Sequence, residues 1–275
     1  MRIKYVNHVG ETIIFGQRPY FINADSILKH EYSYTSSGGR ITGISRFSGV
    51  LQISPTVFIY ATSEKTAAEE KEHLHNVLEK DTASGVYGKL WVGEYYINCL
   101  SVSSTPKQYK FPRKYLEEEI KFITDVPVWR REIGIRFTAI TESTNSGIDY
   151  PYDYSHDFGK TGNILSVIND GFAPCGFELI IYGACTNPTI KIGDQTYSVR
   201  CDVGTGEILI ITSIGEQKTI VLYAKDGSMT NKFNNRDKVN NCFAKIAVGQ
   251  NKVVWNNDFN FDLIMIDERG EPKWN

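Results

Sequence analysis

The stretch from Asn187 to Trp255 constrains the fold most, because it repeats one pattern of short strands and tight turns. Its β-branched runs alternate with Gly-Asp, Gly-Glu, Asp-Gly and Gly-Gln-Asn, whose residues tolerate a positive φ. The runs predicted as strands are 187–192, 197–201, 207–212, 218–224, 242–248 and 252–255. So many strands at such close spacing predict a β-sandwich.

Length and charge narrow the class of protein. A chain of 275 residues is comfortable for two domains. The formal net charge of -2 gives no electrostatic reason to bind nucleic acid or an anionic membrane. No apolar run approaches the roughly 20 residues that cross a bilayer. The N-terminus is strand-like and polar, so we expect neither a signal peptide nor a membrane partner.

The cysteines point to a reducing compartment. Their number is odd, their spacing is wide and no Cys-x-x-Cys pair occurs, so neither zinc binding nor a disulfide framework is expected. Three of them lie among strand residues and are interpreted as small buried hydrophobic residues: Cys99, Cys201 and Cys242. The other two are Cys175 and Cys185. We infer folding in the cytoplasm.

The first half of the chain predicts a β-rich domain, 1–140, with one helix. Residues 3–60 consist of short strand runs, and Pro55 forces a bulge or an edge position in the run 47–61. The segment 63–80 has apolar residues on one helical face, which predicts a helix lying on a sheet. Thr66 with Glu69 fits a capping box, although Ser63 fits the cap position too. His73 and His75 point to different faces and are interpreted as solvated.

The rest of this domain continues as strands. Residues 87–92 and 95–102 predict a hairpin through Gly93-Glu94, and 116–126 alternates with a period of two. After Pro127-Val128-Trp129 a return strand ends near Ala139. Residues 141–162 predict a linker, whose aromatic second half we expect to dock against a domain. The second domain, 163–275, is predicted as the sandwich and closes with alternating apolar residues: Phe259, Phe261, Leu263 and Met265.

A search for chemistry leads to no catalytic, cofactor-binding or metal-ligating residue. Glu117-Glu118-Glu119 offers the paired carboxylates that glycosidases use, but we interpret it as the solvated side of a strand or a negative patch that discourages edge pairing. Gly159-Lys160-Thr161 lacks the first glycine of a phosphate-binding loop, since Tyr154 occupies its place. Asp153, His156 and Asp157 are interpreted as polar surface. The strand tryptophans are assigned to core packing, with sugar stacking as the alternative for an exposed one in the second domain: Trp91, Trp129 and Trp255.

The order of these segments resembles the distal tail protein family of long-tailed phages that infect Gram-positive bacteria. In the first half the resemblance rests on the strand-rich opening, the helix at 63–80 and Pro127-Val128-Trp129. In the second half it rests on short motifs in a fixed order: Ile168-Asn169-Asp170-Gly171, Asn187-Pro188-x-Ile190-x-Ile192-Gly193, Gly206-Glu207-x-Leu209-x-Ile211, Asp226-Gly227 and Gly249-Gln250-Asn251.

The resemblance implies a structural role in a virion. It implies an N-terminal domain that forms a homohexameric ring at the end of the tail tube, and a C-terminal galectin-like sandwich, a jelly roll, that holds receptor-binding or accessory proteins. Its partners would be the tube protein, the tail-tip protein and other copies of itself, and DNA would only pass through the lumen. The implied location is the virion tail tip, after synthesis in the host cytoplasm. The strand at 117–119 and the Gly38-Gly39 loop are candidate ring surfaces.

The sequence is also compatible with two other hypotheses. The sandwich is compatible with a carbohydrate-binding module that has a sugar groove lined by an aromatic residue. A glycan hydrolase requires two carboxylates at about 5 to 10 Å across one cleft. A structural hub without enzymatic activity or cofactors is the leading hypothesis.

Overall fold

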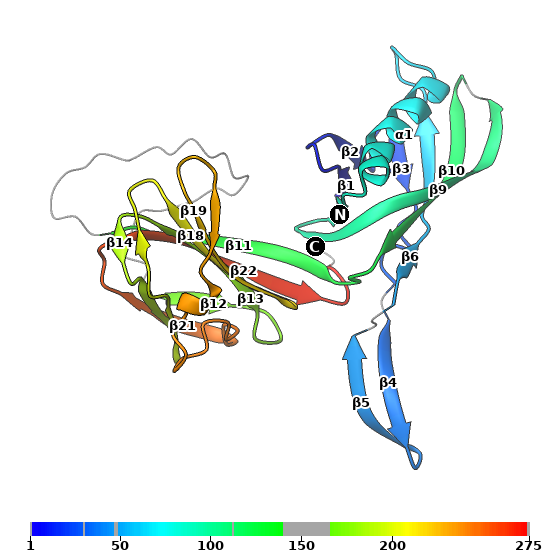
Figure 1. Cartoon of the computed structure of the whole chain (residues 1–275). Helices are drawn as coiled ribbons and strands as arrows, with labels where there is room; N and C mark the ends of the chain where they lie inside the picture. The colour runs from blue at the N-terminus through cyan, green and yellow to red at the C-terminus, as the bar shows by residue number, and fades with distance from the viewer. Residues whose placement is uncertain (1, 30, 47–48, 112, 140–165, 274–275) are drawn as a thin grey trace. The chain divides into compact units, whose positions relative to one another are not determined.

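The computed structural model describes the whole chain except residues 1, 30, 47–48, 112, 140–165 and 274–275. The chain forms two compact units, the first from residues 1–131 and 268–275 and the second from residues 132–267. About half of the residues are in strands, and α1 (Ala67–Ser84) is the one α-helix in the described ranges. The mainly-β prediction with a single helix is therefore confirmed (Figure 1).

Unit 1 is built around one long strand, β9 (Tyr95–Phe111). Its first part pairs with β8 (Gly88–Val92), which continues through β1 (Ile3–Val6) to β2 (Thr12–Phe15). Its second part pairs with β10 (Tyr115–Thr124), which in turn pairs with β6 (Leu51–Ile53) and β7 (Thr56–Tyr60). The strand β3 (Tyr20–Ile22) pairs with β7. The Gly93-Glu94 hairpin is confirmed, and Pro55 divides the predicted run 47–61 into β6 and β7 along one edge of β10.

Helix α1 begins and ends four residues later than the predicted 63–80. Thr66 is the N-cap, and the capping box with Glu69 is complete on both sides. Gly85 ends the helix in the left-handed conformation at φ 66°, which favours glycine. The last turn contains polar residues that resemble a loop in the sequence, but Asp81 is fully buried. Residues 82–84 are exposed, so the helix continues past Lys80 because the buried Asp81 side chain binds Tyr5 and His8.

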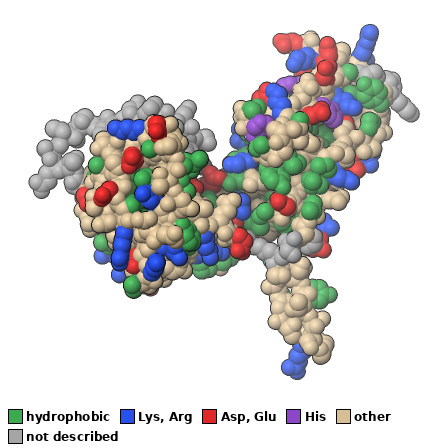
Figure 2. Space-filling view, viewed as in Figure 1, with side chains coloured by type: hydrophobic (Ala, Val, Ile, Leu, Met, Phe, Trp, Pro, Cys, Tyr) green, Lys and Arg blue, Asp and Glu red, His purple; other side chains and the backbone are tan. Residues whose placement is uncertain are grey.

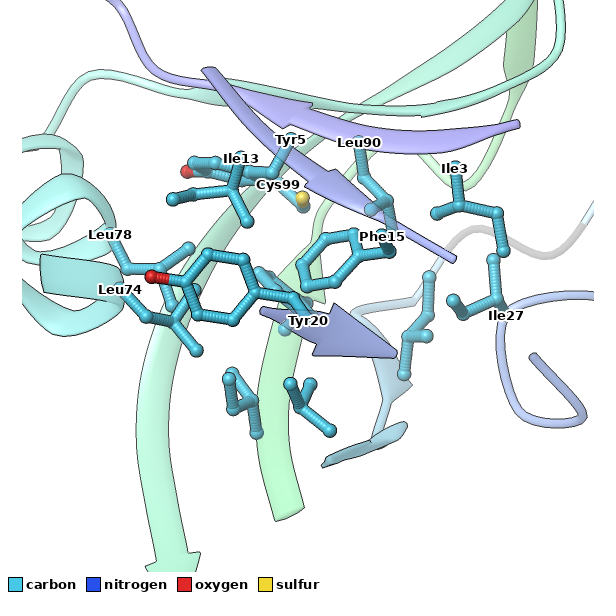
Figure 3. Close-up of a cluster of buried hydrophobic side chains, with 14 of the residues drawn as sticks. Ile3, Tyr5, Ile13, Phe15, Tyr20, Ile27, Leu74, Leu78, Leu90 and Cys99 are labelled. Carbon is cyan, nitrogen blue, oxygen red and sulfur yellow. The ribbon is translucent and has the colours of Figure 1, made fainter. Parts of the chain in front are cut away.

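The core of unit 1 lies between α1 and the strands. Figure 3 shows Leu74 and Leu78 of α1 close to Tyr20, with Ile13, Phe15 and Leu90 from the strands nearby. Leu116, Ile120 and Phe122 of β10 are also buried, which confirms the period of two in that strand. Trp129, at 1% exposed, belongs to the same core.

Residues 32–46 form a sheet of their own. The strands β4 (Tyr32–Ser37) and β5 (Arg40–Arg46) pair only with each other among the described strands (Figure 1). Gly38 and Gly39, at φ 58° and 76°, make the two-residue turn between them, and this geometry is the one that favours glycine in hairpins. The Gly38-Gly39 loop, named from the sequence as a candidate ring surface, is thus a tight hairpin turn.

Unit 2 is a β-sandwich. One sheet has the order β22 (Asn260–Arg269), β13 (Gly176–Tyr182), β18 (Ile208–Ile214), β19 (Gln217–Tyr223), β20 (Met229–Asn231). The other has the order β12 (Ser166–Asn169), β21 (Gly249–Trp255), β15 (Thr189–Ile192), β16 (Gln195–Ser198). Two short strands, β14 (Cys185–Thr186) and β17 (Asp202–Val203), pair separately, and a 3-10 turn, η1, spans Phe233–Asn235. The core contains side chains from both sheets.

Most of the predicted hairpins of unit 2 are confirmed. The turns at Gly193-Asp194, Gly215-Glu216 and Asp226-Gly227 join β15 to β16, β18 to β19 and β19 to β20. Phe259, Phe261, Leu263 and Met265 are all buried, as expected, but Asp262 and Ile266 are buried too, so burial does not alternate along β22. The predicted bend at 249–251 instead belongs to β21.

The predicted strand 242–248 is wrong. This segment makes turns and a single bridge between Cys175 and Ile246. The Tyr197 hydroxyl donates to the Ala244 carbonyl at 2.8 Å, and the Ser213 hydroxyl donates to the Phe243 carbonyl at 2.9 Å. Side chains thus satisfy the backbone groups that a strand would pair in a ladder.

The division of the chain differs from the boundaries at 140 and 163. The strand β11 (Trp129–Phe137) starts in unit 1, but its residues from Glu132 onward belong to unit 2, where Phe137 is part of the core. The chain re-enters unit 1 at Glu268 within β22. The predicted linker 141–162 lies outside the described residues. So do Gly159-Lys160-Thr161 and the Asp153, His156 and Asp157 group.

Candidate functional site

The acidic run of β10 is not uniformly solvated, which corrects the sequence interpretation. Glu118 is 1% exposed because it shares a face with the buried Leu116 and Ile120. Its neighbours Glu117 and Glu119 are on the other face and partly exposed, where Glu119 forms an ion pair of 2.8 Å with Lys107. Only two of the three glutamates therefore contribute to a surface.

Glu118 meets two basic side chains of α1. Its Oε1 lies 3.0 Å from His75 Nε2 and 3.5 Å from Lys71 Nζ. His75 is therefore partly covered rather than simply solvated, whereas His73 is exposed. A buried carboxylate is stable only when it is paired or hydrogen-bonded. The cluster therefore holds α1 on β10.

The same cluster does not have the geometry of a nucleophilic triad. Ser104 Oγ lies 3.2 Å from His75 Nε2, the same ring nitrogen that contacts Glu118. A triad requires the acid and the hydroxyl to contact opposite nitrogens of the imidazole. With both partners on Nε2, the ring cannot pass a proton from the serine while the acid orients it.

A second buried carboxylate, Asp81, joins the end of α1 to β1. Its two oxygens accept hydrogen bonds from the Tyr5 hydroxyl and from the backbone N–H of His8 at 2.8 Å, and its Oδ1 also contacts the His8 ring. Burial, and then the bond to Asp81, raise the pKa of Tyr5 above its ordinary value. Gly88 leaves the space that this group fills, because a Cβ there would overlap Asp81 and Tyr5. Asp81 is fully enclosed, so we assign it a structural role.

Unit 2 also contains a paired set of charged residues. Arg136 contacts Asp262 through Nε at 2.8 Å and Nη2 at 3.0 Å, and the Tyr182 hydroxyl donates to the same carboxylate at 2.8 Å. Elsewhere, burial raises the pKa of Glu178, and the Glu132 carboxylate adds to the effect. Within the described ranges, no three His, Cys, Asp or Glu side chains are grouped to hold a metal ion.

The tryptophan of the described part of unit 2 is packed against other rings. Trp255 makes edge contacts with Phe137 at 5.6 Å and Phe261 at 5.3 Å, and its Nε1 donates to the Phe259 carbonyl. These contacts assign it to the core, as expected from the sequence. Trp129 is likewise buried, and Trp91 packs against Tyr96 at 4.9 Å. The five cysteines carry free thiols, and Cys99, Cys175 and Cys242 are buried. Cys185 and Cys201 are partly exposed, which corrects the burial predicted for Cys201.

The clearest candidate for an interaction surface is one face of the β4/β5 hairpin. Tyr34 pairs with Ile44, and Ser36 pairs with Ile41, so these side chains share a face. Tyr34 is 69%, Ile44 69% and Ile41 65% exposed. The opposite face consists of small polar residues such as Ser33 and Ser45. We name the apolar side, defined by Tyr34, Ile41 and Ile44, the hairpin face.

In the sequence, Gly38-Gly39 is the signal for the turn of this hairpin, and the alternation of the residues on either side is the signal for its apolar face. Serine and threonine residues lie between its apolar residues along the chain, so the segment does not resemble a buried core strand. Figure 2 shows hydrophobic and basic side chains on this hairpin, and histidines among acidic and basic side chains over α1. Among the described helices, none is both long and apolar enough to span a bilayer.

Comparisons with solved structures agree with the family resemblance at the level of the fold. A chain of the phage P2 baseplate in its activated conformation with calcium matches with a TM-score of 0.60 and 14% identity, over 98% of this chain and 99% of that one. The strontium form of that baseplate gives the same values. The SPP1 Dit protein, described as a hub adsorption apparatus of Gram-positive infecting phages, matches with a TM-score of 0.56 and 11% identity, over 98% of both chains.

These matches show that the chain has the fold of phage baseplate and hub proteins. No family model matches the sequence, and no curated protein matches it. The likeness to the distal tail proteins, predicted from the order of the motifs, is thus confirmed by the arrangement of nearly the whole chain.

Proposed function

We propose that this protein is a structural hub of a phage tail tip, which joins the end of the tail tube to the tail-tip and receptor-binding proteins. The observation that carries the proposal is the match over 98% of the chain to proteins of a phage baseplate and of a hub adsorption apparatus. Both units take part in that match, so the proposal concerns the whole chain. The site of action would be the virion tail tip, after synthesis in the host cytoplasm.

Unit 1, close to the predicted domain 1–140, is proposed to form the ring, with about six copies by the family resemblance. The hairpin face supports this role, because exposed apolar surface of this kind marks an interaction site. The sandwich of unit 2, close to the predicted 163–275 galectin-like domain, would hold the accessory proteins. DNA would pass through the lumen without being bound.

We propose further that the protein has no enzymatic activity. The buried carboxylates Asp81 and Glu118 are both held by neighbouring side chains and lie inside unit 1. A general acid or base must instead reach a substrate atom within hydrogen-bond distance. These two groups therefore support a role in stability.

Light scattering coupled to size exclusion tests the ring. We expect one species of about six copies that persists on dilution, and a ring with a central channel by negative-stain electron microscopy. A chain that remains a monomer at high concentration would contradict the hub proposal. A glycan array tests the carbohydrate-binding alternative, which requires binding that is lost when an exposed aromatic residue is replaced.

A further inference from the structure

Two cysteines of unit 2 lie diagonally across the small ribbon made by β14 and β17. Cys185 begins β14, and its partner across the ribbon is Val203 of β17. The backbone N–H of Asn187 donates to the Cys201 carbonyl at 2.9 Å, which extends the same pairing by one residue. Cys201 is therefore the diagonal neighbour of Cys185, on the same side of the ribbon.

Both thiols share one environment. The two side chains are partly exposed, and both pack against the core of unit 2. Burial, and then the charges of Asp258 and Cys201, raise the pKa of the Cys185 thiol to about 11. Burial also raises the pKa of the Cys201 thiol, although the nearby Lys232 ammonium opposes this effect. The charge of one thiolate thus acts on the other, in agreement with their positions across the ribbon.

The ribbon is small enough to adjust. Its two strands have two residues each, and in the part of the chain that the structure describes they pair only with each other. Diagonal neighbours lie about 7–8 Å apart, whereas the Cα atoms of a disulfide lie about 4.4–6.8 Å apart. The thiols therefore join only if the ribbon tightens by about 1–2 Å. A bond formed in this way is strained, and strained disulfides are readily reduced again.

We propose that Cys185 and Cys201 form a reversible disulfide within one chain that fastens the sandwich of unit 2 under oxidising conditions. The bond closes a loop that contains the hairpin of β15 and β16. Closing a loop restricts the unfolded chain and so stabilises the folded unit. The inference goes beyond the proposed function, and only its setting rests on it: a hub made in a reducing cytoplasm meets oxidising surroundings in the free virion.

The bond forms in two exchange steps with a small-molecule disulfide, here oxidised glutathione. The Cys201 thiolate attacks one sulfur of that disulfide, which gives a mixed disulfide and releases one glutathione thiolate. The Cys185 thiolate then attacks the Cys201 sulfur and releases the second. Two protein thiols are oxidised, one glutathione disulfide is reduced, and the two protons pass to the released thiolates. Cys201 acts first because Lys232 favours its thiolate.

Thiol counting and mass spectrometry on the full chain test the inference. The reduced protein has five free thiols, so treatment with oxidised glutathione should leave three, because the bond consumes two. Peptide mapping without reduction should show Cys185 joined to Cys201 within one chain. Because burial raises the pKa of both thiols, the rate should rise about tenfold for each pH unit above neutral pH, as the thiolate fraction does.

Single substitutions separate the bond from the fold. Cys185→Ser should hold a mixed disulfide on Cys201 without a crosslink, and Cys201→Ser should also form no crosslink. The matched control, Cys175→Ala, removes a thiol outside the pair and should crosslink as the wild type does. Oxidation should raise the melting temperature of the wild type by about 5 °C and leave that of the serine variants unchanged. Circular dichroism verifies that each variant folds.

Several results would overturn the inference. These are five thiols that persist after oxidation, glutathione retained on both cysteines, or a crosslink that joins two chains or other cysteines. An oxidised wild type that melts at the temperature of the reduced protein would reject the stabilising role. None of these readouts depends on oligomeric state. A ring that fails this test therefore leaves the hub proposal intact, whereas a monomer that forms the bond overturns the hub proposal alone.

Discussion

Glu118 shows what alternation along a strand can reveal about a single residue. Its position has the same parity as Leu116, Ile120 and Phe122, so burial follows from the pattern of β10. Its partner His75 is 43 residues away, and nothing in the local sequence connects the two. Asp81 and Tyr5, 76 residues apart, were unpredictable for the same reason. A sequence pattern gives the face of a residue, while the pairing depends on the tertiary fold.

Gly88 gives a prediction at this scale. Replacing it with alanine would place a Cβ where the Asp81 carboxylate and the Tyr5 ring lie. We expect Gly88→Ala to lower the free energy of unfolding by about 2–3 kcal/mol, because both neighbours are buried and cannot move freely. Urea denaturation measures the change. Gly43→Ala is the matched control, since there the Cβ meets only the hydroxyl of Thr35; equal losses in both variants would contradict the explanation.

Glu178 gives a prediction that depends on pH. Burial raises the pKa of the Glu178 carboxyl in the folded state. The protonated carboxyl therefore contributes its full stabilisation below the unfolded pKa, and this stabilisation is lost as the pH rises through the folded pKa. Glu178→Gln cannot ionise. We therefore expect the variant to match the wild type in acid and to melt at a higher temperature at pH 8. Melting temperatures measured across pH would refute this if the difference were constant.

Among the elements, the hairpins were predictable and the compact turns were not. Gly193-Asp194 and Gly215-Glu216 specify their turns locally, because the residues that tolerate the geometry lie between the strands they join. Residues 242–248 are apolar enough for a strand, yet Tyr197 and Ser213 bind their carbonyl groups from distant strands. The helix of unit 1 was predicted, but its end depended on the burial of Asp81.

The start of α1 can be tested directly, because the sequence allowed two caps. The structure assigns the cap to Thr66, whose hydroxyl accepts the N–H of Glu69 at 3.3 Å. We expect Thr66→Ala to cost about 1 kcal/mol of stability, the usual value for a lost N-cap. Ser63→Ala should cost nothing measurable. Chemical denaturation of both variants decides between them, and a larger loss at Ser63 would reject the assigned cap.

At the scale of the molecule, the sequence indicates two modules but not where the chain passes between them. Residues 129–137 form one uninterrupted strand, so no change of composition marks the division at 131 and 132. The return at residue 268 also falls inside a strand, β22. A division based on composition places the boundary at the predicted linker. The two units are instead defined by the core in which each side chain is buried.

Two separate cores lead to a prediction about independent unfolding. Leu90 in unit 1 and Leu209 in unit 2 are both fully buried. Each change to alanine should cost about 2–5 kcal/mol, and each should increase hydrogen exchange chiefly in its own unit. Exchange followed by mass spectrometry locates the effect. Equal acceleration in both units by either variant would show that they unfold as one.

The return of the chain to unit 1 also fixes an order in time. A ribosome makes residues 132–267 before it reaches position 268, so unit 1 receives its last segment only after the whole sandwich has been synthesised. A chain cut short at any earlier codon would lack that segment. Chains released before position 268 would therefore carry an unfinished unit 1 beside a fully synthesised sandwich.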